Sequence, residues 1–127
     1  MKLPENFQGR DLADAYLREA KLHGANLIGA NLQRADLRGA DLRSARLVSA
    51  DLTYADLTDA DLSNANLRYA KFYGADLTGV NLTGANLSGA DLTEAKMFDV
   101  NLTDADLSNV KLSDVKLSKG WKLVRDE

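Results

Sequence analysis

Residues 25–44 read ANLIG ANLQR ADLRG ADLRS, a five-residue phrase in which alanine is followed by Asn or Asp, then leucine, then two variable residues. A strict period of five fits neither regular element. On an α-helix every fifth leucine would move about 140° around the axis, and on a flat strand leucines five apart would alternate between the two faces. The chain must therefore turn at every repeat so that each leucine returns to the core. This pattern predicts an all-β fold, a coiling β-solenoid.

The leucine position, which we call the centre of each repeat, recurs in steps of five from Phe7 to Leu117, so the chain has 23 repeats without an insertion. Twenty centres are leucine, and 17 of the 21 residues that precede a centre by two positions, from Ala15 to Val115, are alanine. Two positions after the centre, eight of 23 residues are glycine and nine are Asp, Asn or Ser. Those residue types tolerate positive φ or cap a turn with a side chain. The core residues and the turn residues therefore repeat in step.

The A-[DN]-L-x-x pattern resembles that of the pentapeptide-repeat family, and the resemblance covers residues 5–119. It implies a right-handed quadrilateral β-helix with four repeats in each coil, and about six coils in this chain. Residues twenty apart would then lie above one another in columns on the outside of the rod.

We expect one domain, because a solenoid buries its core as a column in which each coil contacts only its neighbours. The expected divisions are an irregular N-terminal cap (1–14), regular repeats (15–119) and a C-terminal cap or tail (120–127), within a single domain (1–127). In the tail, Trp121, with Leu123 and Val124, is predicted to cover the open core of the last coil, and a dimer contact is the alternative.

Several classes of chemistry have no support in the sequence. There is no cysteine, and the single histidine, His23, falls in an outward position without a second histidine nearby. The glycines from Gly74 to Gly89 are five apart and serve turns, so they do not form a phosphate-binding loop. A convex, filled rod also lacks the concave pocket that catalysis needs. We therefore predict that the chain is not an enzyme, and that it has no cofactor, no metal and no small-molecule substrate.

The distribution of apolar residues predicts where in the cell the protein is found. We find no apolar signal segment at the start of the sequence and no run of 18 apolar residues. The expectation is a soluble, cytoplasmic protein without membrane contact.

Charge is distributed unevenly along the chain, although the net charge is only −3. Residues 10–46 carry seven basic and five acidic groups, residues 51–106 carry three basic and ten acidic groups, and residues 111–127 carry five basic and three acidic groups. The rod should therefore have an acidic middle between weakly basic ends.

Exposed apolar residues mark one candidate interaction surface. Ile28 and Val48 share a column that leads to Arg68, and three tyrosines are expected next to it across one corner: Tyr54, Tyr69 and Tyr73. Tyr and Arg are enriched at binding hot spots. We predict that this surface binds a protein partner, and that the chain itself is a monomer or a weak end-to-end dimer.

Two acidic columns form a second candidate site. Asp36, Asp56 and Asp76 share one column, and Asp41 and Asp61 share another. The simpler interpretation is a solvated ladder that supports adjacent turns. The alternative comes from the resemblance, since some members of the family mimic DNA and bind DNA gyrase or topoisomerase. Against it stand the small net charge, the basic ends and the lack of a long apolar C-terminal extension.

Two further possibilities have less support. The arginines of residues 34–46 suggest direct binding of nucleic acid, but this basic band is diluted by Asp36 and Asp41, so no direct nucleic-acid contact is expected. A purely structural role is the remaining possibility.

Overall fold

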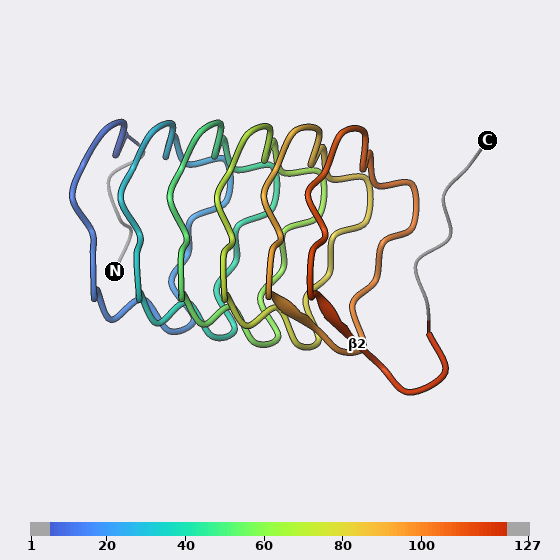
Figure 1. Cartoon of the computed structure of the whole chain (residues 1–127). Coiled ribbons are helices and arrows are strands. Elements are labelled where there is room, and N and C mark those ends of the chain that lie inside the picture. Colours follow the sequence, from blue (N-terminus) through green and yellow to red (C-terminus); the bar gives the residue numbers. More distant parts are fainter. Residues whose placement is uncertain (1–5, 122–127) are drawn as a thin grey trace.

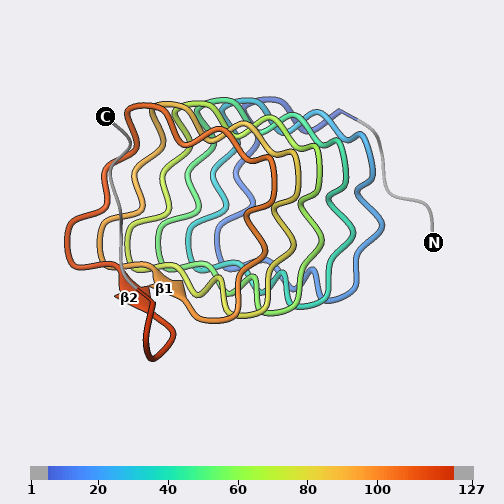
Figure 2. The same cartoon turned by 90° about the vertical axis from the view of Figure 1, so that its right-hand side faces the viewer.

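The rod is built from stacked coils of chain (Figure 1), and the computed structural model describes residues 6–121. Parallel bridges join residues twenty apart, from Asn6 with Asn26 to Asp91 with Lys111. The next contact of the same register, Lys96 with Lys116, lengthens into two strands, β1 (Lys96–Met97) and β2 (Lys116–Leu117), which pair in parallel. A register of twenty is the one that four repeats per coil require. Figure 2, which is turned by 90°, shows the coils lying one behind another.

Hydrogen bonds between coils and within turns explain why the five-residue repeat folds in this way. In the repeat centred on Leu32, the leucine N–H donates to the Asp51 carbonyl of the next coil at 2.7 Å, and the Leu32 carbonyl accepts from the Ala35 N–H at 3.0 Å. The first bond stacks the coils and the second closes the turn. The same pair of bonds recurs along the chain, so backbone groups are satisfied partly within each turn and partly by the neighbouring coil.

The core is a dry column of leucine and alanine. From Leu27 to Leu92, every centre and every residue two positions before a centre exposes at most 1% of its surface. Phe72 is the largest of these side chains, and no polar or charged residue is buried within the described part of the chain. Because the interior holds only packed apolar groups, all polar chemistry lies on the outside of the rod.

The turn position is left-handed from Gly9 to Asp114. All 22 residues two positions after a centre, from Gly9 to Asp114, have φ between 54° and 72°, and 14 of them are not glycine. This confirms that the position requires positive φ, the conformation in which glycine, Asn and Asp are favoured.

The two ends differ from the middle. Regular pairing begins at Asn6, inside the segment that the sequence marks as an irregular cap. Near the ends, centres such as Leu12 and Leu112 are only half-buried. Trp121 keeps 56% of its surface exposed, and Leu123 and Val124 lie outside the described residues, so the C-terminal cap stays a prediction. The described residues include no helix that is long and apolar enough to cross a membrane.

Candidate functional site

The structure places the predicted columns as expected. The Gly29 N–H donates to the Val48 carbonyl and the Ser49 N–H to the Arg68 carbonyl, each at 2.9 Å, so Ile28, Val48 and Arg68 follow one another along one column. The side chains of Ile28 and Val48 are half-buried, and that of Arg68 is exposed. This column therefore offers little apolar surface to a partner.

The three tyrosines divide into two sites on different turns. The first, which we call the Tyr54 corner, consists of Tyr54, Tyr73, Gly74 and Glu94. The Tyr54 and Tyr73 rings meet edge to face, with centroids 5.6 Å apart and an angle of 86° between the planes. The Tyr73 hydroxyl donates a hydrogen bond to the Glu94 carboxylate. Glu94 was not among the residues singled out from the sequence, since it lies 21 residues from Tyr73 and only the coil register brings them together.

The second site, which we call the Tyr69 corner, consists of Arg68, Tyr69 and Gly89. The Arg68 guanidinium lies over the Tyr69 ring, 5.5 Å from its centroid, at the distance of a cation–π contact. No ring contact joins Tyr69 to Tyr54 or Tyr73 among the described residues. The single patch expected from the sequence is therefore two separate aromatic pairs.

Tyr54 and Tyr69 both occupy the left-handed turn position. Tyr54 has φ 58° and Tyr69 has φ 59°, and they expose 57% and 56% of their surfaces. A left-handed backbone costs about 1 kcal/mol for a residue of this kind relative to glycine. Each ring gains little from burial in return, which is unusual for an aromatic side chain.

A glycine in the next coil makes room for each ring. A Cβ atom on Gly89 would lie 2.5 Å from Cε1 of Tyr69, and a Cβ atom on Gly74 would lie 2.6 Å from Cδ1 of Tyr54. Real side chains do not approach so closely. Glycine at these two positions therefore lets the rings lie against the rod, so each corner pairs a tyrosine with a glycine twenty residues later.

The hydrogen bond from Tyr73 changes the acidity of its hydroxyl. Donation to Glu94, together with the negative charge of that carboxylate, raises the pKa of Tyr73 from 10.0 to about 12. A neutral hydroxyl next to a carboxylate is more stable than a phenolate there. Tyr73 therefore stays protonated and keeps Glu94 in place well above neutral pH.

The acidic columns form as predicted, and their oxygen atoms hold the turns. Bridges join Asp36 to Asp56, Asp56 to Asp76, and Asp41 to Asp61. In each column the carboxylate accepts a hydrogen bond from the N–H two residues later, as in Asp56 with Thr58 at 3.0 Å. Asn residues at the same position make the same bond, so this contact needs an oxygen atom and not a charge.

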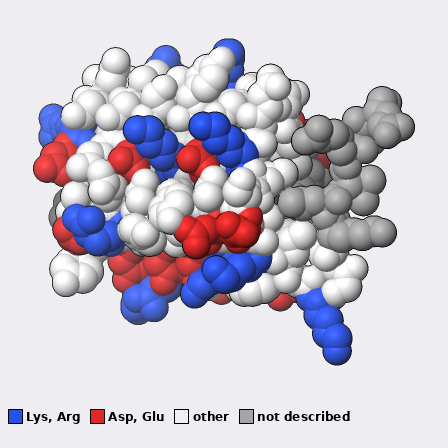
Figure 3. Space-filling model, in the orientation of Figure 1, with Lys and Arg blue, Asp and Glu red and all other residues white. Residues whose placement is uncertain are grey.

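Arginines neutralise much of this acidic surface. Arg38 forms two hydrogen bonds with Asp36 and lies 3.6 Å from Asp56, and Arg18 binds Asp36 from the coil before. Arg43 pairs in the same bidentate way with Asp41, and this hydrogen bond lowers the pKa of the Asp41 carboxyl. Figure 3 shows basic side chains beside acidic ones at several places on the visible face. The columns therefore do not present an unbroken negative surface.

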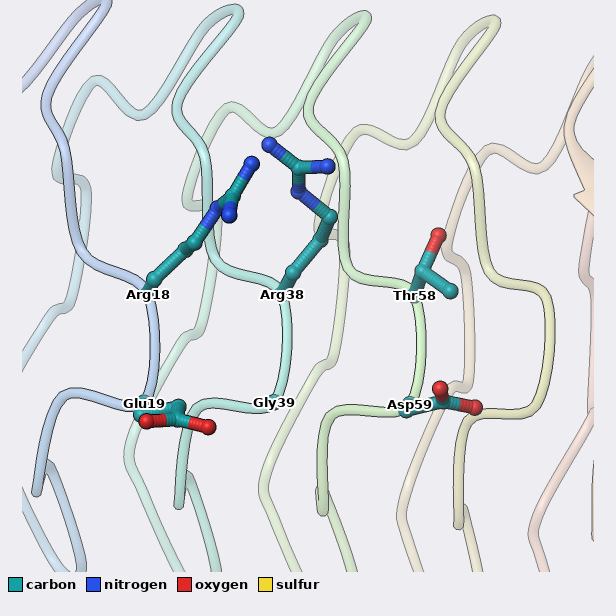
Figure 4. A pocket seen from close by; sticks show the side chains of 6 residues that line it. All are labelled: Arg18, Glu19, Arg38, Gly39, Thr58 and Asp59. Carbon is teal, nitrogen blue, oxygen red and sulfur yellow. The ribbon is translucent and has the colours of Figure 1, made fainter.

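The rod has a shallow hollow of about 290 Å³ along one edge. Figure 4 shows Arg18, Arg38 and Thr58 in one row beside a second row of Glu19, Gly39 and Asp59. Both arginines bind Asp36, so they are already engaged. No three His, Cys, Asp or Glu side chains within residues 6–121 come together as metal ligands would. The remaining polar groups that line the hollow are Glu19, Thr58 and Asp59.

Comparison with known proteins gives one family and several similar folds. The family model "Pentapeptide repeats (8 copies)" matches residues 11–47, 45–84 and 75–114. A search of curated protein sequences finds no match.

Three solved structures are similar to this chain. HetL from Nostoc sp. strain PCC 7120, described as involved in the regulation of heterocyst differentiation, is 28% identical, with a TM-score of 0.56 over 87% of this chain and 73% of its own. A protein of the Arabidopsis thaliana thylakoid lumen is 38% identical, with a TM-score of 0.54 over 85% of this chain and 72% of its own. Rfr23 from Cyanothece 51142 is 36% identical over 77% of this chain, with a TM-score of 0.46, and the chain spans 64% of its length. All three are described as pentapeptide repeat proteins.

Proposed function

We propose that this chain, which belongs to the pentapeptide repeat family, is a non-catalytic rod of about six coils that binds a protein partner through its aromatic corners. The observation that supports this most strongly is the placement of Tyr54 and Tyr69. Among the 22 left-handed turn positions, these two alone hold an aromatic residue, and both rings are more than half exposed. Tyrosine is enriched at binding hot spots, where a rigid ring adds contact area at little entropic cost.

The non-catalytic part of the proposal rests on what the outer surface offers. Many of its polar side chains are engaged with their own turns or with neighbouring arginines, as Thr58 is with Asp56 at 2.6 Å. The hollow beside Gly39 is shallow, and the two arginines in it are paired with Asp36. Binding to another protein needs only an exposed complementary surface, whereas catalysis would also need free polar groups that converge on a substrate.

A pull-down from the lysate of the native host tests the proposal. The tagged full chain is compared with a variant in which Tyr54 and Tyr69 are both replaced by glycine, a residue that the left-handed turn favours. We expect a stoichiometric partner with the parent chain and its loss with the double variant. A partner that binds both chains equally would remove the aromatic corners from the proposal, and the lack of any partner would favour a purely structural role.

The alternative is a DNA mimic that binds gyrase or topoisomerase, and it has less support. A mimic needs a row of uncompensated negative charges, whereas arginines contact three of the five candidate carboxylates: Asp36, Asp41 and Asp56. Asp61 and Asp76 remain available for such a row. A gyrase supercoiling assay in the presence of excess protein separates the two proposals, because only the mimic predicts inhibition.

A further inference from the structure

We propose that the Tyr54 corner binds an arginine or lysine side chain, presented by a basic segment of a protein partner, with the cation over the Tyr54 ring and beside Glu94. The inference rests on the proposed function and narrows it to one of the two corners and one class of partner.

The first support is the preorganised aromatic ring. Tyr54 lies against Gly74 and meets the Tyr73 ring edge to face, while 57% of its surface stays open to solvent. Tyr73 is fixed in turn by its hydrogen bond to Glu94. A cation that binds here therefore meets a ring and a carboxylate that already have their positions, so little ordering is needed on binding.

The second support is the charge around the ring. Asp56 follows Tyr54 by two residues, and its bridge partner Asp76 follows Gly74 by two residues. Within the described residues, Asp76 and Glu94 form no ion pair, and Asp56 has only the 3.6 Å contact with Arg38. Lys96 is the bridge partner of Asp76, and Lys71 precedes Tyr73 by two residues, but neither lysine forms an ion pair with these carboxylates within residues 6–121. The corner also lies in the acidic middle, where ten acidic groups face three basic ones over residues 51–106.

The third support is the other corner of the same molecule. Tyr69 occupies the same turn position as Tyr54 and lies over a glycine in the same way, and its ring already holds the guanidinium of Arg68. The residue that precedes Tyr54 is Thr53, and its hydroxyl binds Asp51. The Tyr69 corner thus shows, within this chain, the contact that a partner's arginine would make at the Tyr54 corner, where the cation is missing among the described residues.

A peptide titration tests the inference. The probe is a capped glycine–serine peptide that carries arginines, and the control peptide carries citrulline, a neutral side chain of nearly the same shape, at the same positions. Binding to the full chain is followed by aromatic NMR signals of the tyrosine rings. We expect the arginine peptide to shift the Tyr54 and Tyr73 signals and the citrulline peptide to leave them unchanged.

Variants locate the site. Tyr54→Gly should weaken binding of the arginine peptide about five- to ten-fold, the range for one cation–π contact next to a carboxylate. Tyr69→Gly is the matched control and should change binding by less than about two-fold, because Arg68 already occupies that ring. Glu94→Gln keeps the Tyr54 ring and should weaken binding about three-fold.

The inference is overturned if the citrulline peptide binds equally well, if Tyr54→Gly binds as the parent chain does, or if neither peptide shifts the Tyr54 signals. None of these results contradicts the proposed function, which the pull-down tests separately. A partner that needs the tyrosines but carries no basic segment would support the proposed function and not this inference. A peptide that binds as expected, with no partner in the lysate, supports this site and removes the proposed function.

Discussion

The repeat at residues 51–54, DLTY, and the repeat at residues 66–69, NLRY, end in the same tyrosine and differ at two positions. In the second repeat Asn66 accepts the Arg68 N–H at 3.3 Å and carries no charge, so the Arg68 guanidinium is free to lie over Tyr69. In the first repeat Asp51 accepts both the N–H and the hydroxyl of Thr53, at 3.0 and 2.5 Å. The ring of Tyr54 is left without a cation from its own repeat.

Two other repeats show what decides where an arginine goes. Arg38 and Arg43 occupy the same position in their repeats as Arg68, but the residue two positions before each of them is aspartate. Both arginines form bidentate pairs with that aspartate. A charge-assisted pair with a carboxylate is stronger than an exposed contact with a ring. Gly39 and Ser44 follow these two arginines, so neither has a ring beside it. We therefore expect Asp before the leucine to draw the arginine to a carboxylate, and Asn to leave it for a neighbouring ring.

The largest expected effect is a loss of stability, and it concerns the feature that the two corners share, the glycine beneath each tyrosine ring. Gly74→Ala and Gly89→Ala should each lower the free energy of unfolding by about 2 kcal/mol, about half from the left-handed backbone and about half from displacement of the tyrosine. Gly29→Ala is the control, because its Cβ would contact nothing within 4 Å at a similar φ of 65°. It should lower the free energy by only about 1 kcal/mol.

Urea unfolding followed by circular dichroism measures these differences. Adding Tyr54→Gly to Gly74→Ala should recover the part due to the ring. If all three alanine variants lose equal stability, the rings do not depend on the glycines and the two corners lose their shared feature.

The sequence predicts the features that follow from the period. The five-residue spacing places Leu32 and Ala35 in the core, Gly74 and Gly89 in left-handed turns, and Asp56 above Asp76 in one column. Each of these depends only on the backbone, which repeats with the register of twenty. A regular pattern is enough to determine them.

The contacts between surface side chains depend on the conformation of each side chain, which the five-residue period does not determine. The sequence places Tyr54, Tyr69 and Tyr73 near one another but does not show that Tyr73 turns toward Glu94 or that Arg68 covers Tyr69. It also places Arg38 and Arg43 next to acidic columns without showing that they pair with them. The sequence signal for this pairing is an aspartate two positions before the arginine, as in Asp36 with Arg38.

The next effect is a pH dependence of stability that only the Tyr54 corner should show. The pKa of Tyr73 is about 12 in the folded chain and close to 10.0 in the unfolded chain, so its bond to Glu94 contributes stability that is fully present below about pH 10 and is lost as the pH rises toward 12. Spectrophotometric titration of the tyrosines should show one group that ionises late. Glu94→Gln should bring that group back toward 10, and a titration unchanged by this substitution would remove the Tyr73–Glu94 bond from the Tyr54 corner.

A third, smaller effect tests whether the two corners can be made alike. Asp51→Asn combined with Thr53→Arg turns residues 51–54 into a copy of residues 66–69. The new arginine should cover the Tyr54 ring and weaken binding of an arginine peptide by about five-fold, since the site is filled from within. Thr53→Arg alone is the matched control, because Asp51 should pair with the arginine and leave the ring open. Equal binding by both variants would show that the residue before the leucine does not direct the arginine.

The smallest effect comes from the reverse exchange at the other corner. Asn66→Asp should draw the Arg68 guanidinium away from Tyr69 into a bidentate pair like that of Arg38 with Asp36. One exposed contact replaces another, so the free energy of unfolding should change by less than about 0.5 kcal/mol. The side-chain protons of Arg68, shielded by the ring in the parent chain, should move downfield in the NMR spectrum, and the Tyr69 ring should then bind an arginine peptide. If the Arg68 signals do not move, the arginine stays on the ring despite a carboxylate in its own repeat. Charge at that position would then not be what distinguishes the two corners.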